Sequence, residues 1–119
     1  MNRLFDDTVF HSLGAELGEA DTLEVLDAFL TDTASKMETL AANGKARPLI
    51  RREAHSIKSS AATFGFEDLS RLASELEFAA ETVTPARLQE SICELRRAFE
   101  ATRQFAQVNL LATGQETAT

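Results

Sequence analysis

The sequence predicts an all-α fold: an antiparallel up-down four-helix bundle with a short extra helix at the N-terminus. Two observations support this prediction. The 119 residues include no Trp or Tyr and only two Pro, and Ala, Leu, Glu and Arg are abundant, which is a helix-forming composition. Apolar residues also recur every three or four positions in five segments that are separated by turns of a few residues. Four such segments of similar length are typical of a bundle, and none shows the alternation of a strand.

The first two predicted helices occupy roughly the first third of the chain. Residues 8–17 form the short helix, with Asp7 as its N-cap. Asp21 and Glu24 resemble a capping box that opens a long helix, which Asn43-Gly44 ends. Val25 and Phe29 are expected to form a ridge that receives the short helix. The expected core stripe of the long helix consists of Leu23, Leu26, Leu30, Ala34, Met37 and Ala41.

Three further helices complete the predicted bundle. One begins at Arg47-Pro48, where proline fits a first turn, and ends at Gly65 through a left-handed conformation. Its apolar stripe is Ile50, Ala54, Ile57, Ala61 and Phe64. Residues 67–82 form the next helix, and Thr84-Pro85 opens the last one, which extends to about residue 109. We therefore expect one domain over residues 1–119, with a bundle core at about 19–109 and a flexible tail at 110–119.

One polar cluster stands out on the predicted helix after Pro48. His55, Lys58 and Ser59 lie at i, i+3 and i+4 and so share a face. On a helical wheel His55 falls about 140° from Ile50, outside the apolar stripe, so its side chain is expected to be exposed. An accessible neutral imidazole is a nucleophile, and a nearby ammonium can balance the negative charge of a phosphoryl group placed on it. Ser59 and Ala62 are small enough to let a second protein reach the ring.

The pattern His55-x-x-Lys58-Ser59-Ser60 followed by Phe64-Gly65 resembles the signature of histidine-containing phosphotransfer (HPt) domains. The resemblance covers about residues 5–108; many members have Gly where this chain has Ser59. It implies that His55 accepts a phosphoryl group from a receiver-domain aspartyl phosphate, or from a histidine kinase system, and passes it to a response regulator. It assigns charge stabilisation to Lys58, a position kept small to Ser59 and a structural role to Gly65. It also implies a monomer that binds no cofactor, because the receiver supplies the acidic pocket and Mg²⁺.

Two alternatives remain open. The chain is an excised HPt domain of a hybrid or chemotaxis-type histidine kinase, or it is an adaptor that binds a receiver without transferring phosphate. Such adaptors typically lack the histidine, whereas His55 and Lys58 are both present. The chain contains no ATP-binding segment with Asn and Gly boxes, so it is expected to have no ATP-dependent kinase activity of its own. The initial Met and the unpatterned tail favour a free-standing protein.

Charge is unevenly distributed. The net charge of −7 argues against general nucleic-acid binding. Between residues 45 and 58, however, five cations face one anion, which suits docking to an acidic partner. Arg51, Arg52, Ala62 and Phe78 are the candidate docking residues, and Phe78 lies on the polar side of its helix.

Several other classes of function are disfavoured. No apolar run approaches the ~18 residues of a membrane span, and the N-terminus lacks a signal-peptide core, so we expect a cytoplasmic protein that does not bind membranes. No His, Cys or carboxylate spacing predicts a metal site. The single cysteine, Cys93, is expected to be a partly buried structural thiol.

Overall fold

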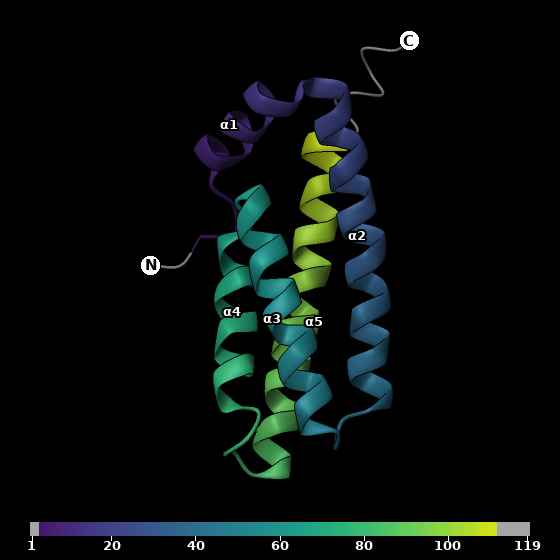
Figure 1. Cartoon of the computed structure of the whole chain (residues 1–119), viewed down its shortest axis with the longest axis vertical. Coiled ribbons are helices and arrows are strands. Elements are labelled where there is room, and N and C mark those ends of the chain that lie inside the picture. Colours follow the sequence, from purple (N-terminus) through teal and green to yellow (C-terminus); the bar gives the residue numbers. More distant parts are fainter. Residues whose placement is uncertain (1–2, 112–119) are drawn as a thin grey trace.

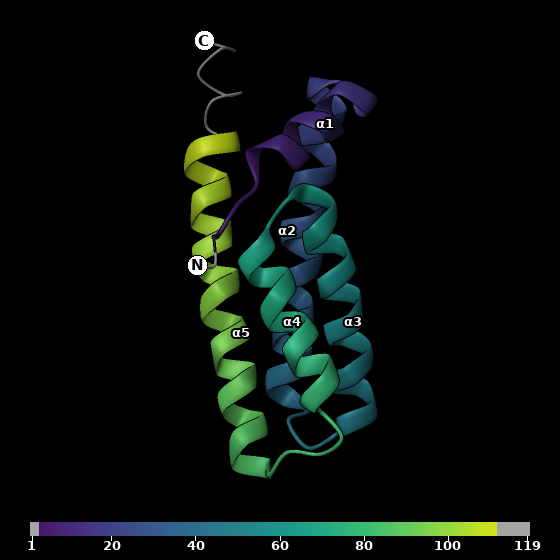
Figure 2. The same ribbon diagram turned by 90° about the vertical axis from the view of Figure 1, so that its left-hand side faces the viewer.

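The computed structural model describes residues 3–111, which form five α-helices and a final π-helical turn (Figure 1). The helices are α1 (Asp7–Leu17), α2 (Glu19–Ala42), α3 (Arg47–Phe64), α4 (Glu67–Ala79) and α5 (Pro85–Ala106), followed by the turn Gln107–Leu111. No strand occurs within residues 3–111. Helices α2 to α5 run up and down beside one another, and α1 lies across one end of them (Figures 1 and 2). The predicted bundle with a short N-terminal helix is confirmed.

The two N-terminal helices begin earlier than predicted. Asp6 is the N-cap of α1, because its carboxylate accepts a hydrogen bond from the Thr8 amide at 3.0 Å, whereas Asp7 lies in the first turn. The capping box at Asp21 is wrong, since α2 already begins at Glu19 and has no side-chain cap. Gly18 explains this difference: its φ of +90° turns the chain so sharply that α2 starts directly after α1 ends.

The other helix ends follow the prediction more closely. Asn43 ends α2, and proline stands in the first turn of α3. The Thr84 hydroxyl accepts a hydrogen bond from the Arg87 amide at 3.2 Å and so caps α5. Helix α4 ends at Ala79, three residues before the predicted end, and a turn follows it. Residues 112–119 of the predicted flexible tail lie outside the described residues, while 110 and 111 belong to the π-helical turn.

The core confirms the α3 stripe and corrects that of α2. All five predicted residues of α3 are buried. In α2, Ala41 is exposed and Leu40 is buried instead, and Val25 is 41% exposed. Phe29 is a core residue whose ring lies 5.0 Å from that of Phe64, between centroids, so it packs against α3. Because α2 packs against α1, α3 and α5, its buried face is wider than a single stripe.

The connection between α3 and α4 depends on Gly65. Gly65 adopts the left-handed conformation, with φ +85°, as predicted. Its carbonyl accepts a hydrogen bond from the Asp6 amide at 2.7 Å, which fastens the N-terminal segment to this turn. A Cβ atom on Gly65 would lie 2.5 Å from the Asp6 carbonyl oxygen. Glycine is therefore required here both for the backbone conformation and for the close approach of another segment.

None of the helices within residues 3–111 combines the length and the apolarity needed to cross a membrane.

Candidate functional site

His55 stands on the surface of α3, opposite the buried stripe of that helix. Its side chain is 60% exposed, as the helical wheel predicts. Ring atom Nδ1 lies 2.8 Å from carboxylate atom Oε2 of Glu77, which projects from the neighbouring helix α4. The ring is therefore held on one side and open to solvent on the other.

Lys58 shares the same carboxylate. Its Nζ donates a hydrogen bond to Oε1 of Glu77 at 2.8 Å, so one carboxylate bridges an imidazole and an ammonium. Glu77 is 20% exposed and Lys58 33%, so both are more buried than His55. We call His55, Lys58 and Glu77 the bridged triad. It places a cation and a carboxylate beside one accessible ring.

The protonation of Glu77 determines which nitrogen of His55 is available. The hydrogen bond from Lys58 lowers the pKa of Glu77 below its usual value, and that from His55 adds to the effect, although partial burial opposes both. At neutral pH Glu77 is thus a carboxylate, which only accepts hydrogen bonds. Nδ1 of His55 must then carry the proton of their shared hydrogen bond. In the neutral ring this leaves the lone pair on Nε2, the nitrogen that Glu77 does not hold.

Small residues let α3 and α4 approach closely enough for this bridge. Ala54 and Ala61 of α3, Ala73 of α4 and Ala80, the C-cap of α4, are all fully buried. The Ser70 hydroxyl of α4 adds a hydrogen bond to the Lys58 carbonyl at 3.0 Å. The two helices are therefore fixed relative to each other on both sides of the triad.

Sequence reasoning did not identify Glu77 as a site residue. Glu77 lies 22 residues after His55, so no helical spacing connects them. The available signal was indirect: Glu77 follows the inward-facing Leu76 in a helix that is predicted to pack beside α3. Helix α4 contains several acidic residues, and the sequence does not show which of them lies opposite His55. That depends on how α3 and α4 are aligned along their axes.

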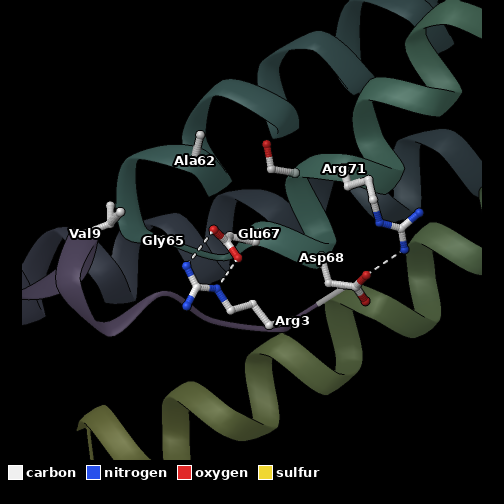
Figure 3. Close-up of a pocket in the computed structure, with 8 residues that line it drawn as sticks. Arg3, Val9, Ala62, Gly65, Glu67, Asp68 and Arg71 are labelled. Carbon is white, nitrogen blue, oxygen red and sulfur yellow. Dashed lines mark hydrogen bonds and ion pairs between the residues drawn. The ribbon is translucent and has the colours of Figure 1, made fainter. Parts of the chain in front are cut away.

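Ser59 and Ala62 continue the exposed face of α3 beyond His55. Both are exposed, as expected of residues next to an accessible ring. Ala62 borders a hollow of 460 Å³ that Val9 and Glu67 also line (Figure 3). Across this hollow the Arg3 guanidinium pairs with Glu67, with Nε 2.6 Å from Oε2 (Figure 3). Ala62 and Gly65 therefore adjoin the N-terminal segment, away from the Glu77 side of His55.

The other candidate docking residues gather on the Glu77 side. A hollow of 420 Å³ is lined by Pro48, Arg51, Arg52, His55, Glu77 and Glu81. Arg51 pairs with Glu81 at 3.0 Å, and both side chains are largely exposed. Arg52 is 75% exposed, and its Nε lies 3.8 Å from Oε1 of Glu53. Phe78 is 88% exposed.

Two other sequence expectations concern metal and cysteine chemistry. Within residues 3–111, no three or more His, Cys, Asp or Glu side chains come together where they could hold a metal ion. Cys93 is exposed on α5, so the prediction of a partly buried thiol is wrong. It lies just beyond the buried face that Ile92 and Leu95 form.

A comparison with protein-family models shows which family contains this chain. The model of the Hpt domain family matches residues 24–105, which include all of the bridged triad. The chain belongs to the Hpt family. It is a histidine phosphotransfer protein of phosphorelay signalling, and Hpt proteins pass phosphoryl groups to the receiver domains of response regulators.

A solved structure supports the same assignment. This Hpt domain is similar to the crystal structure of histidine-containing phosphotransfer protein B from Pseudomonas aeruginosa, with 28% sequence identity and a TM-score of 0.79. The similarity covers 87% of this chain and 91% of the other. A search of curated proteins found no match. Helix α1 precedes the residues that the family model matches.

Proposed function

We propose that His55 is the phosphorylated residue of this Hpt domain, and that it accepts the phosphoryl group from an aspartyl phosphate of one receiver domain and donates it to another. The observation that carries this proposal is the bridged triad: an accessible imidazole whose Nδ1 is hydrogen-bonded to a carboxylate that also holds an ammonium. His11, the other histidine of the sequence, is exposed on α1 and outside this cluster.

The proposed transfer involves one bond formed and one broken. Nε2 of His55 attacks the phosphorus, the N–P bond forms, and the bond between phosphorus and the aspartyl oxygen breaks, which leaves a free carboxylate on the receiver. The proton on Nδ1 stays in place, so the phosphorylated ring is cationic. Glu77 lies 2.8 Å from that nitrogen and balances the developing charge. The reverse reaction delivers the phosphoryl group to the next receiver.

Lys58 supplies the complementary charge. Its ammonium stands one helical turn from His55 and can turn from Glu77 toward the phosphoryl oxygens without a change in the backbone. We expect the receiver to supply its acidic pocket and Mg²⁺, so that this chain binds no cofactor. Ser59 leaves room for the receiver, Gly65 keeps the end of α3 in place, and we expect a cytoplasmic monomer.

The first test is phosphoryl acceptance by the wild-type chain and by His55→Gln. A receiver charged with labelled phosphate is mixed with each protein in Mg²⁺, and the label on each protein is followed. We expect label on the wild type only, in an acid-labile and base-stable form, with little change in the melting temperature because His55 is exposed. Label on His55→Gln would show that a residue other than His55 is phosphorylated. A folded wild type that takes no label from several receivers would favour the adaptor alternative.

A second prediction concerns Lys58. Lys58→Ala is expected to slow phosphoryl acceptance by roughly 10- to 100-fold, because one charge-assisted contact to the transition state is lost. Rapid-quench measurement of labelled protein would give the rate. Lys36→Ala is the matched control, since this lysine pairs with Asp32 and Glu53 between α2 and α3. Equal rates for Lys58→Ala and wild type would show that Lys58 does not stabilise the transferred phosphoryl group.

A further inference from the structure

We infer that Phe78 is the apolar anchor with which this Hpt domain docks its receiver, on the α4 side of His55. This inference rests on the proposed function and adds to it the residue that sets the affinity for the partner. The partner surface that fits is an apolar patch on the receiver, next to its acidic phosphorylation pocket.

The exposure of Phe78 is the first observation. Its side chain is 88% exposed, while the other large exposed hydrophobic residues of the described chain lie between 36% for Val9 and 61% for Val108. The other phenylalanines within residues 3–111 are buried or half-buried. A fully exposed ring at a surface gains free energy only when a partner covers it, and aromatic residues dominate the affinity of protein interfaces.

The position of Phe78 is the second observation. Phe78 directly follows Glu77, which holds both His55 and Lys58. It lines a hollow of 410 Å³ together with Arg51, Lys58, Ser74, Glu77 and Glu81. The hollow next to it, which His55 borders, shares Arg51, Glu77 and Glu81. A protein that reaches His55 from this side therefore contacts Phe78.

The charges around Phe78 select the kind of partner. The two hollows are bordered by three cations, Arg51, Arg52 and Lys58, and by two carboxylates, Glu77 and Glu81, so cations are in excess. The Arg51–Glu81 pair is exposed and exchangeable. An acidic surface gains from these cations, whereas a second copy of this chain would bring the same cations against them. The patch thus combines an apolar anchor with a border in which cations outnumber carboxylates by three to two, which suits an acidic pocket that has an apolar edge.

The test measures transfer from a phosphorylated receiver as a function of receiver concentration, for wild type, Phe78→Ala and Phe78→Leu. We expect the KM for the receiver to rise roughly 10- to 30-fold in Phe78→Ala, with kcat nearly unchanged, and to rise less in Phe78→Leu. Phosphorylation of His55 by phosphoramidate, a small donor that needs no docking, should be equal in all three proteins. Val108→Ala is the control, because it removes an exposed apolar side chain from the C-terminal turn.

Each outcome has a distinct meaning. If the wild type accepts no phosphate from receivers, the proposed function fails. If the wild type accepts it and Phe78→Ala has the same KM, the receiver does not dock on Phe78 and this inference is overturned. The inference is also overturned if Phe78→Ala leaves the KM unchanged but converts a dimer into a monomer in analytical ultracentrifugation, since the ring would then bind a second copy.

Discussion

Glu77 of α4 forms hydrogen bonds with two side chains of α3, His55 and Lys58. These bonds fix the tautomer of the His55 ring and the position of the Lys58 ammonium. The Glu77 carboxylate is 2.8 Å from Nδ1 of His55 and 2.8 Å from Nζ of Lys58. The first bond assigns the proton of the ring to Nδ1, and the second keeps the ammonium within one turn of the ring. The sequence alone identified His55 and Lys58, because their spacing is local, but it did not identify the carboxylate that orients them.

The bond between Glu77 and Lys58 should make stability depend on pH. The pKa of Glu77 is lowered from its ordinary 4.5, so its stabilising effect is complete above about pH 4.5 and is lost as pH falls through the lower folded-state pKa. We expect Glu77→Gln to lose about 1 kcal/mol of unfolding free energy at pH 7 and a smaller amount at pH 3, because protonation of Glu77 below pH 4.5 weakens the same bond in the wild type. Urea unfolding at both pH values measures the difference.

A matched variant separates this effect from a general change in charge. Glu38→Gln, at an exposed position of α2, should unfold like the wild type at both pH values. A loss of stability in Glu77→Gln that is as large at pH 3 as at pH 7 would contradict the role of the ionised carboxylate.

At the scale of elements, the α3–α4 hairpin contains the whole bridged triad, with His55 and Lys58 on α3 and Glu77 on α4. The stripe of α3, from Ile50 to Phe64, was predicted in full because a helix with one buried face repeats every 3.6 residues. The stripe of α2 was predicted only in part, because this helix contacts several neighbours and buries Phe29 and Leu40 as well. The turn at Gly65 was predicted from the need for a left-handed residue, a purely local requirement.

The same turn supports a prediction about stability. Gly65→Val should cost about 3 kcal/mol, because a β-branched residue is strained at a φ of +85° and its Cβ would lie 2.5 Å from the Asp6 carbonyl oxygen. Chemical denaturation measures the loss. Gly14→Ala is the control, since the nearest atom to its new Cβ is 3.9 Å away, and it should be at least as stable as the wild type because alanine is favoured over glycine inside a helix. A stable Gly65→Val protein would show that the N-terminal segment does not hold this turn.

At the scale of the whole molecule, the N-terminal segment connects parts of the bundle that are distant in sequence. The Phe5 ring lies, between centroids, 5.7 Å from Phe10, 5.6 Å from Phe66 and 4.8 Å from Phe105. The start of the chain is therefore packed against the α3–α4 turn and the end of α5. These contacts lie away from the Glu77 side of His55, where the docking candidates Arg51 and Arg52 lie.

Removal of Phe5 tests this connection. Phe5→Ala should lower the unfolding free energy by about 2 kcal/mol, because a half-buried ring with three aromatic neighbours is lost. Phosphoryl acceptance from phosphoramidate should stay at the wild-type rate under native conditions. Phe78→Ala, which removes an exposed ring, should not lower stability in the same urea experiment. Equal midpoints for Phe5→Ala and wild type would mean that the N-terminal segment does not stabilise the bundle.

By itself, the sequence determined the helical class, the outward position of His55 and Lys58, the left-handed turn at Gly65 and the capped start of α5. Each of these depends on residues within a few positions of one another, where helical geometry leaves few choices. The tertiary structure alone decided that Glu77 bridges the two site residues and that Asp6 binds Gly65. These contacts join segments 19 to 59 residues apart, and their register follows from how small side chains such as Ala54 and Ala73 pack, which local patterns do not specify.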